Sequence, residues 1–384
     1  MKRRKIVYIL GGNYNANGMS HVLCQKINYL PEHTDYQVFV VLTEQPGKPF
    51  YYPLSPKIEY VNFDINFDEL DTMPIGKKIY YYFKKQALYK KKLTEYLCYI
   101  TPDITVSVMR RKINFINDIP DGSKKIGEIH FNKSNYREFN KSYFPNFINR
   151  RITKIWRKRL ITEIKRLSQF VVLSHEDREA WSELYNVIVI PNPLSFYPSN
   201  QSNCREKRVI AVGRYTYQKG FDMLIDAWKK VAQRHIDWKL DIYGSGDNET
   251  FQSLANLNSL KESVICHSAV KDIYEKYIES SIFVLSSRYE GFGLVLAEAM
   301  SCGIPAVTFT CPCGPKDIVT DKVDGLWVEP NNVDELAEKI CYLIEHEDER
   351  LKMGVAAVKS SQRYHEDEIM KQWIDLFNKF ASDY

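Results

Sequence analysis

The feature of this sequence that most constrains its fold is a regular alternation of short strand-like runs with longer amphipathic segments. In the first half, runs rich in β-branched and aromatic residues predict strands at 5–10, 37–42, 104–108, 125–130, 170–173 and 187–190. The second half repeats the pattern at 208–213, 239–244, 264–267, 282–286 and 306–309, with helical patterns such as 221–233 and 294–300 between the runs. This alternation predicts β-α-β units and a parallel sheet in each half.

Two domains are expected, because 384 residues exceed the size of about 250–300 residues at which a single hydrophobic core stops growing. Residues 191–207 are rich in Pro, Ser and Asn and lack periodicity, so we interpret them as a linker between domains 1–190 and 208–365. Each domain is expected to be a doubly wound α/β sheet, with ligands bound beyond the carboxyl ends of the strands in a cleft between the domains. The apolar spacing within 366–384 predicts a carboxyl-terminal helix that packs back on the first domain.

The cysteines and the apolar segments favour a reduced, cytoplasmic protein. The apolar run that follows the basic start is only five residues long, 6–10, and no stretch approaches the roughly 20 apolar residues that span a bilayer. Eight scattered cysteines in a chain without an export signal indicate free thiols. Cys311 and Cys313 are closely spaced, but no second pair stands at zinc-binding spacing, so we interpret them as loop thiols.

The stretch most informative about function is SSRYEGFGLVLAEAMSCGIPAV, at residues 286–307. A predicted strand runs here into a glycine-containing loop and then into a helix that starts near Gly293 or Leu294, and the N–H groups of such a helix terminus bind anions. Glu290 lies in the loop and Glu298 in the helix, and carboxylates are acceptors suited to sugar hydroxyls. Taken alone, the stretch leaves open that Glu298 only complements the helix dipole and that Glu290 is a solvated loop residue.

In this context Glu290 and Glu298 resemble the paired-glutamate motif of the retaining GT-B glycosyltransferases of family GT4, the glycosyl transferases group 1. Upstream, Arg214 and Lys219 in VGRYTYQKGFD follow a predicted strand and resemble the diphosphate-binding pair of that family. Other features of the family follow in order along the second half, namely IYGSGD with Gly244 and Gly246, CGIPAV, and GPKDIV. The resemblance implies the GT-B fold, in which two Rossmann-like domains face each other across a cleft.

The resemblance is thinner in the first half. Gly11, Gly12 and Gly18 flank the first predicted helix, and His130 ends a predicted strand in GEIHFN. In the family a histidine at this place lies beside the transferred sugar, whereas a lone histidine at a strand end is more often structural. The sequence departs from the family at Pro193, where many relatives carry glycine, which leaves the conformation of the hinge open.

The resemblance also implies a role for each site residue. Arg214, Lys219 and the helix terminus would stabilise the diphosphate leaving group, Glu298 would hold the ribose, and Glu290 would hold donor-sugar hydroxyls. We therefore name four catalytic candidates, namely Glu290, His130, Arg214 and Lys219. The donor-binding candidates are Gly11, Gly12, Gly18, Gly213, Arg214, Lys219, Gly244, Gly246, Glu290, Gly291, Phe292, Gly293, Leu294 and Glu298. No covalent nucleophile or base is assigned, and no metal or other cofactor is expected, since no Asp-x-Asp motif stands at a strand end.

The reaction implied is retaining transfer of a hexose or N-acetylhexosamine from a nucleotide sugar to a glycan or lipid-linked glycan in bacterial surface polysaccharide synthesis. CPCGPKDI resembles relatives that use UDP-sugars, and GDP-mannose is the alternative donor. Two rival functions remain open: a nucleotide-sugar 2-epimerase, which shares fold and donor class, and a non-catalytic partner subunit. The absence of this Arg-x4-Lys and EGFG combination from the epimerases argues against the first rival.

Charge is distributed unevenly along the chain. Residues 1–200 hold 31 Lys and Arg against 19 Asp and Glu, whereas residues 201–384 hold 22 against 29. Much of the positive excess lies in two expected amphipathic helices, 77–92 and 150–167. Such a surface suits nucleic acid, a phosphorylated acceptor or an anionic membrane, and its simplest explanation is a solvated face. Because no nucleic-acid module is recognised, we expect no nucleic acid partner and a peripheral contact with the inner face of the cell membrane.

Overall fold

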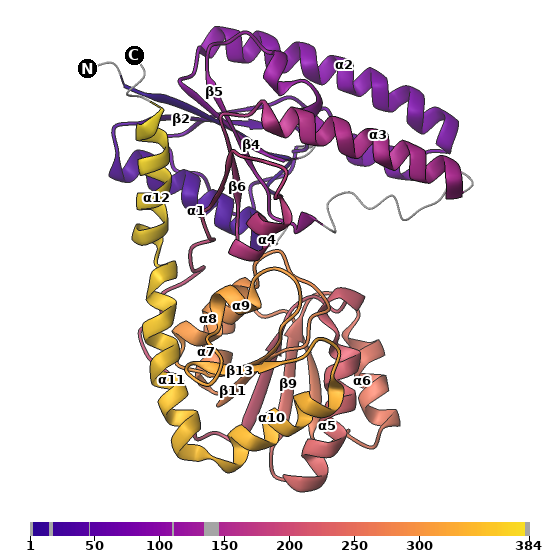
Figure 1. The fold of residues 1–384 in the computed structure, drawn as a ribbon, viewed down its shortest axis with the longest axis vertical. Coiled ribbons are helices and arrows are strands. Elements are labelled where there is room, and N and C mark those ends of the chain that lie inside the picture. Colours follow the sequence, from indigo (N-terminus) through magenta and orange to yellow (C-terminus); the bar gives the residue numbers. More distant parts are fainter. Residues whose placement is uncertain (1–2, 15–17, 46, 110, 134–145, 381–384) are drawn as a thin grey trace. The chain divides into compact units, whose positions relative to one another are not determined.

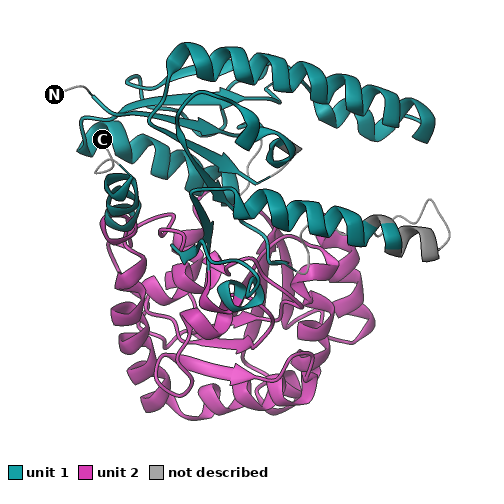
Figure 2. Cartoon of the chain, turned by 45° about the horizontal axis from the view of Figure 1, so that its top comes forward, with its two compact units in different colours: residues 1–173, 177–190, 370–384 teal, residues 174–176, 191–369 magenta. Residues whose placement is uncertain are grey.

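The computed structural model describes residues 3–14, 18–45, 47–109, 111–133 and 146–380, with the side chains of 111, 146–150 and 152 left out. The chain divides into two compact units, which are coloured separately in Figure 2. The first unit comprises residues 1–173, 177–190 and 370–384, and the second comprises 174–176 and 191–369. The segment that we interpreted as a linker, 191–207, is part of the second unit, where Leu194 N donates to Tyr364 O and Ser202 N to Cys302 O.

The described residues of the first unit form a seven-stranded parallel sheet in the order β3-β2-β1-β4-β5-β6-β7 (Figure 1). Its strands are β1 (Lys5–Ile9), β2 (Gln37–Leu42), β3 (Glu59–Asn62), β4 (Ile104–Val108), β5 (Lys124–Glu128), β6 (Gln169–Val172) and β7 (Val187–Val189). Six of these strands lie where the sequence predicted them, within two residues. The edge strand β3 was missed, because it is short, polar at both ends and only partly buried.

Helices cover both faces of this sheet. They are α1 (Gly18–His33), α2 (Ile75–Ile100), α3 (Asn146–Lys165), α4 (His175–Ala180) and α12 (Glu366–Lys379), with 3-10 turns η1 (Phe67–Thr72), η2 (Arg111–Asn114) and η3 (Ile116–Asp118). One face carries a core in which α2 and α3 contribute residues such as Leu93 and Leu160. On the other face Trp373 and Phe377 of α12 are fully buried. The Phe377 ring packs against Tyr36, which directly precedes β2.

The second unit is built on a six-stranded parallel sheet among its described residues, in the order β10-β9-β8-β11-β12-β13. Its strands are β8 (Arg208–Val212), β9 (Lys239–Gly244), β10 (Val264–Ser268), β11 (Ile282–Leu285), β12 (Ala306–Phe309) and β13 (Gly325–Val328). Only β13 was not predicted. The helices and 3-10 turns are η5 (Tyr217–Lys219), α5 (Phe221–Arg234), α6 (Asn248–Leu257), α7 (Ile273–Ile278), α8 (Leu294–Ser301), α9 (Pro315–Ile318), α10 (Val333–Glu345), α11 (Glu347–Ser361) and η6 (Gln362–Tyr364).

The strand order of the second sheet positions the candidate site. The chain proceeds outward from β8 through β9 to β10, and then returns to the other side of β8 with β11. The loops that follow β8 and β11 therefore leave neighbouring strands at the point where the winding reverses, which is where open α/β sheets bind ligands. These are the loops that carry Arg214, Lys219 and Glu290.

Candidate functional site

The centre of the site in the second unit is an ion pair between the two loops at the reversal point. Lys219 Nζ donates a hydrogen bond of 2.7 Å to Glu290 Oε1, and Ser287 Oγ donates one of 2.6 Å to the same oxygen. The side chains of Lys219 and Glu290 are only 12% and 7% exposed. The sequence predicted both residues as ligand contacts but did not predict that they contact each other.

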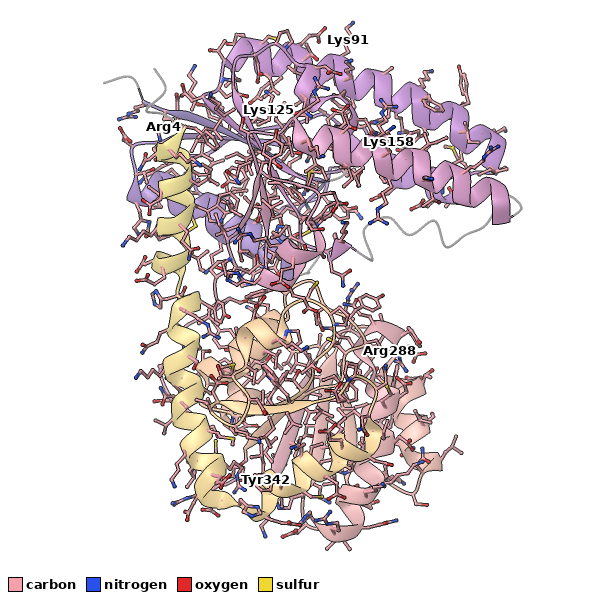
Figure 3. All side chains as sticks on the ribbon, viewed as in Figure 1. Arg4, Lys91, Lys125, Lys158, Arg288 and Tyr342 are labelled. Atoms are coloured by element: carbon pink, nitrogen blue, oxygen red, sulfur yellow. The ribbon has the colours of Figure 1, made fainter. Side chains whose placement is uncertain are left out.

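Arg288 fastens the two loops together. Its guanidinium makes a two-pronged ion pair with Asp222, with N···O distances of 2.9 and 2.6 Å, and also donates to Tyr217 O at 2.7 Å. Arg288 is labelled in Figure 3. Such bidentate pairs combine energy with defined geometry. The guanidinium carbon lies 3.9 Å from the centre of the Tyr217 ring. Arg288 thus holds the loop between β8 and α5 against the loop that follows β11.

Gln218 joins the same network. Its amide donates to Tyr289 O at 3.0 Å and accepts from Arg214 at 3.3 Å. Sequence reasoning named neither Gln218 nor Arg288 as part of the site. The only available signal was their position beside Lys219 and Glu290, which does not reveal a contact between loops 70 residues apart.

Two glycines have a packing reason to be glycine. A Cβ atom on Gly244 would lie 1.7 Å from the carbonyl oxygen of Gly213, and one on Gly314, at φ 118°, would lie 1.8 Å from the carbonyl oxygen of Phe292. A side chain at either place would push the loop away from its neighbour. These glycines keep the backbones of the site loops close, which is a role separate from contact with a ligand.

Helix α8 directs its amino terminus at the same place. It begins at Leu294, and its N-cap residue Gly293 has φ 90° and makes no side-chain capping hydrogen bond. An uncapped helix terminus carries partial positive charge and attracts anions. The preceding loop is held by a hydrogen bond of 3.2 Å from Glu290 N to Pro312 O and by the buried Phe292 ring, which packs edge-on against Tyr364.

Glu298 lies within α8 rather than in its first turn, and it is buried. Its carboxylate accepts hydrogen bonds from Ser195 Oγ at 2.5 Å and from Tyr277 OH at 3.3 Å. Burial raises its pKa above the ordinary value of 4.5, and these hydrogen bonds and the charge of Lys219 only partly oppose the shift. Ser195 and Tyr277 were not predicted, and their distance along the chain from Glu298 gave no signal.

In the first unit, the predicted glycines lie around the amino terminus of α1. A Cβ atom on Gly12 would lie 2.0 Å from Glu44 O, whereas nothing lies within 4 Å of one on Gly18. A cavity of about 200 Å³ opens here, lined by Gly11, Gly12, Asn13, Tyr14, Ser20, Glu44, Asp68 and several apolar side chains. Glycine at position 12 is therefore explained by packing within its own unit.

His130 lies two residues beyond the end of β5, and its side chain is only 4% exposed. Its Nε2 is 3.1 Å from Oε1 of Glu128, which in turn forms an ion pair with Lys26 of α1. Sequence reasoning missed Glu128 and Lys26. The signal was present for Glu128, because residues two apart in a strand project from the same face.

The predicted site residues thus fall into two groups. The second unit holds Gly213, Arg214, Lys219, Gly244, Gly246, Glu290, Gly291, Phe292, Gly293, Leu294 and Glu298, and the first unit holds Gly11, Gly12, Gly18 and His130. Among the described residues, no cluster of three or more His, Cys, Asp or Glu side chains is placed to hold a metal ion. No described helix is both long enough and apolar enough to cross a membrane.

The buried Glu298 leads to a prediction about stability. Because its pKa in the folded state is raised, the native protein binds more protons than the unfolded chain between pH 4.5 and the raised value, so stability falls as the pH rises through this window. Glu298→Gln removes the titration. We expect the melting temperature of Glu298→Gln, relative to wild type, to increase from pH 4 to pH 7.

A matched control is Glu345→Gln in the same unit. Burial raises the pKa of Glu345, but the hydrogen bond and charge of Arg234 more than offset this and lower it. The melting temperature of Glu345→Gln, relative to wild type, should therefore decrease from pH 4 to pH 7. A melting-temperature difference for Glu298→Gln that stays constant or decreases with pH would contradict the assignment.

Comparison with known proteins relates part of the chain to a known family. Residues 196–360 match the model of the family described as Glycosyl transferases group 1. An uncharacterized glycosyltransferase of Haemophilus influenzae is 32% identical over 236 residues, which cover 60% of this chain and 66% of that protein. The amylovoran biosynthesis glycosyltransferase AmsD of Erwinia amylovora is 34% identical over 220 residues, 54% of this chain and 61% of that protein. These matches thus span about two thirds or less of the relatives' own length.

A solved structure supports the fold over nearly the whole chain. Staphylococcus aureus TarM, as a mutant in complex with fondaparinux, α-GlcNAc-glycerol and UDP, aligns with a TM-score of 0.76 and 16% identity, covering 98% of this chain and all of that one. Identity at this level speaks for the fold alone. Residues 196–360 form a domain that matches the glycosyl transferases group 1 family, and the chain has the GT-B fold.

Proposed function

We propose that this protein is a retaining glycosyltransferase that moves a hexose or N-acetylhexosamine from a nucleotide sugar to a glycan or lipid-linked glycan. The observation that carries the proposal is the Lys219–Glu290 pair, placed at the reversal point of the sheet beside the uncapped terminus of α8. A buried cation, a carboxylate and a helix terminus together suit a ligand that joins a diphosphate to a polyhydroxylated sugar.

The pair suggests how charge is handled in the reaction. Without a ligand, Glu290 neutralises Lys219, so that neither charge is buried alone. When a nucleotide sugar binds, the ammonium of Lys219 can turn to the diphosphate. Arg214 and the N–H groups at the start of α8 add positive charge at the same place. Positive groups already in place at the leaving group are the largest contribution to many such steps. Glu290 is then available to accept hydroxyls of the donor sugar.

UDP-sugars are the favoured donors, and synthesis of a bacterial surface polysaccharide is the favoured setting. AmsD is named for amylovoran biosynthesis, and the TarM complex contains UDP together with α-GlcNAc-glycerol. A 2-epimerase would convert the nucleotide sugar without an acceptor, and a non-catalytic subunit would turn over nothing. Incubation with a panel of UDP- and GDP-sugars, with analysis of both released nucleotide and sugar isomer, separates these three functions.

Replacement of Lys219 tests the charge assignment. Lys219→Ala should lower kcat for nucleotide release by roughly 10²- to 10³-fold, the effect of losing one well-placed donor, or about 2.7–4 kcal/mol. The matched control is Lys229→Ala, which removes an exposed lysine paired with Asp226 on α5 and should leave kcat unchanged. Equal activity of Lys219→Ala and wild type would exclude Lys219 from the site.

Chelation tests whether side chains suffice to neutralise the diphosphate. We assign that work to Lys219, Arg214 and the α8 terminus, so activity should persist in EDTA. The measurement is the rate of nucleotide release before and after dialysis against the chelator, followed by addition of Mg²⁺. Loss of activity in EDTA that Mg²⁺ restores would contradict the assignment of neutralisation to side chains alone.

We further propose a peripheral contact with an anionic membrane through the first half of α2. Between Ile75 and Leu88 this helix has no buried residue, and it exposes six large apolar or aromatic side chains, Ile75, Ile79, Tyr80, Tyr81, Phe83 and Leu88. The exposed cations Lys77 and Lys84 lie among them. Aromatic side chains with neighbouring lysines suit a lipid–water interface, where each cation near an anionic leaflet contributes about 1 kcal/mol.

Some lysines of α2 make hydrogen bonds within the first unit, so a membrane test should leave them unchanged. Lys85 donates to Ile65 O, Asn66 O and Glu69, and Lys92 donates to Phe63 O, so both hold the first unit together. The test is therefore co-sedimentation with anionic and with neutral liposomes, using Lys77→Glu/Lys84→Glu and Tyr80→Ser/Phe83→Ser. Both double variants should lose binding to anionic vesicles, while Lys229→Glu should keep it. Wild-type protein that sediments equally with both vesicles, or with neither, would contradict the proposal.

A further inference from the structure

Three titratable side chains, one of them His130, lie buried between the sheet of the first unit and its helix α1. Lys26, Glu128 and His130 have side chains that are 1%, 0% and 4% exposed. The ammonium of Lys26 and the Nε2 atom of His130 approach the same carboxylate oxygen, Oε1 of Glu128, the latter at 3.1 Å. The three groups thus form a chain from α1 through β5 to the histidine.

Stability alone does not explain this cluster. Desolvating a lysine and a glutamate costs much of what their attraction returns, and apolar residues of similar volume often replace such a pair without loss. The surroundings here include Trp373, whose ring centre is 4.6 Å from Lys26 Nζ. An apolar core at this place would be simpler to fold. Buried charge retained beneath a candidate site residue indicates a role in function.

The neighbours of Glu128 favour its charged form. Burial raises its pKa, but Lys26 and His130 more than offset this effect and lower the pKa to about 2. The lowered pKa favours the carboxylate form of Glu128, which can only accept hydrogen bonds. Its second oxygen, Oε2, makes no hydrogen bond within the described part of the chain.

The contact between Glu128 and His130 is close but not yet aligned. His130 Nε2 lies 3.1 Å from Glu128 Oε1, which is within hydrogen-bonding distance, but Nε2 makes no hydrogen bond of good geometry among the described residues. Hydrogen bonds of this kind are often loose without substrate and tighten in the complex.

We propose that Glu128 is a positioning residue for His130, and that Lys26 keeps Glu128 in place for this role. The inference rests on the proposed function, and on the expectation from the family resemblance that His130 lies beside the transferred sugar. By accepting the N–H of one ring nitrogen, Glu128 fixes the orientation of the imidazole and leaves the opposite nitrogen to meet a substrate hydroxyl. Lys26 prevents the carboxylate from turning toward another partner.

A double-mutant cycle distinguishes positioning from a purely structural role. The full-length protein is assayed for UDP release from UDP-glucose and UDP-N-acetylglucosamine, as wild type, Glu128→Gln, His130→Ala and the combined variant. His130→Ala should lower kcat by roughly 100-fold. Glu128→Gln should lower kcat by about tenfold or more, with little change in the KM of the donor. Loss of a carboxylate that orients a metal-ligating histidine has an effect of about this size in other enzymes.

The decisive comparison is the effect of Glu128→Gln once His130 is gone. If Glu128 acts through His130, Glu128→Gln should change the kcat of the His130→Ala variant by less than about twofold. If Glu128→Gln lowers kcat by the same factor with and without His130, or leaves wild-type kcat unchanged, the positioning role is wrong.

Folding is controlled with a second pair of variants. Glu128→Gln leaves Lys26 buried without its counter-charge, so Lys26→Met/Glu128→Gln removes both charges and is compared with and without His130→Ala. The same dependence on His130 is expected for this pair. Glu32→Gln, which breaks the exposed Glu32–Lys57 ion pair of the same unit, should leave kcat unchanged.

The cycle also separates this inference from the proposed function. If wild type releases no nucleotide from any nucleotide sugar, the proposed function fails, and the positioning role fails with it. If wild type is active but His130→Ala is equally active, the positioning role alone is overturned. Non-additive loss at Glu128 and His130, with an unchanged donor KM, supports both.

Discussion

The candidate site of the second unit depends on the reversal of strand order between β8 and β11. Because these strands are neighbours, residues 71 positions apart, Lys219 and Glu290, come within 2.7 Å of each other. The Arg288–Asp222 pair keeps the two loops at this spacing. The chemistry proposed for this protein therefore follows from sheet topology first and from side-chain identity second.

The parts of the fold that could be predicted are those whose signal is local. Buried central strands such as β1 and β9 appear as short apolar runs, so they were found within a residue or two. The edge strand β3 is partly exposed and polar, and β13 is a four-residue run that begins with glycine, so neither differs locally from a loop.

The site residues also divide into those with a local sequence signal and those without one. Its charged residues were predicted from their place after strands, but their partners were not, since Ser195, Tyr277 and Lys26 reach the glutamates through tertiary packing alone. Within the expected amphipathic helix 150–167, the apolar residues are not all buried: Ile155 is exposed, whereas Leu160 and Ile164 are buried. The helix α3 extends past the sheet at its beginning, so only its later turns have a surface to pack on (Figure 1).

Both units bury carboxylates at their candidate sites, but they do so in different ways. Glu298 has no ion-pair partner among the described residues, only two hydroxyl donors, and burial raises its pKa. Glu128 sits between a lysine and a histidine, and their charges lower its pKa to about 2 despite complete burial. Burial thus favours the neutral form of Glu298, whereas the neighbouring charges favour the carboxylate form of Glu128. Glu298 is thus suited to exchange its hydroxyl donors for those of a ligand, and Glu128 to hold a neighbouring side chain in place.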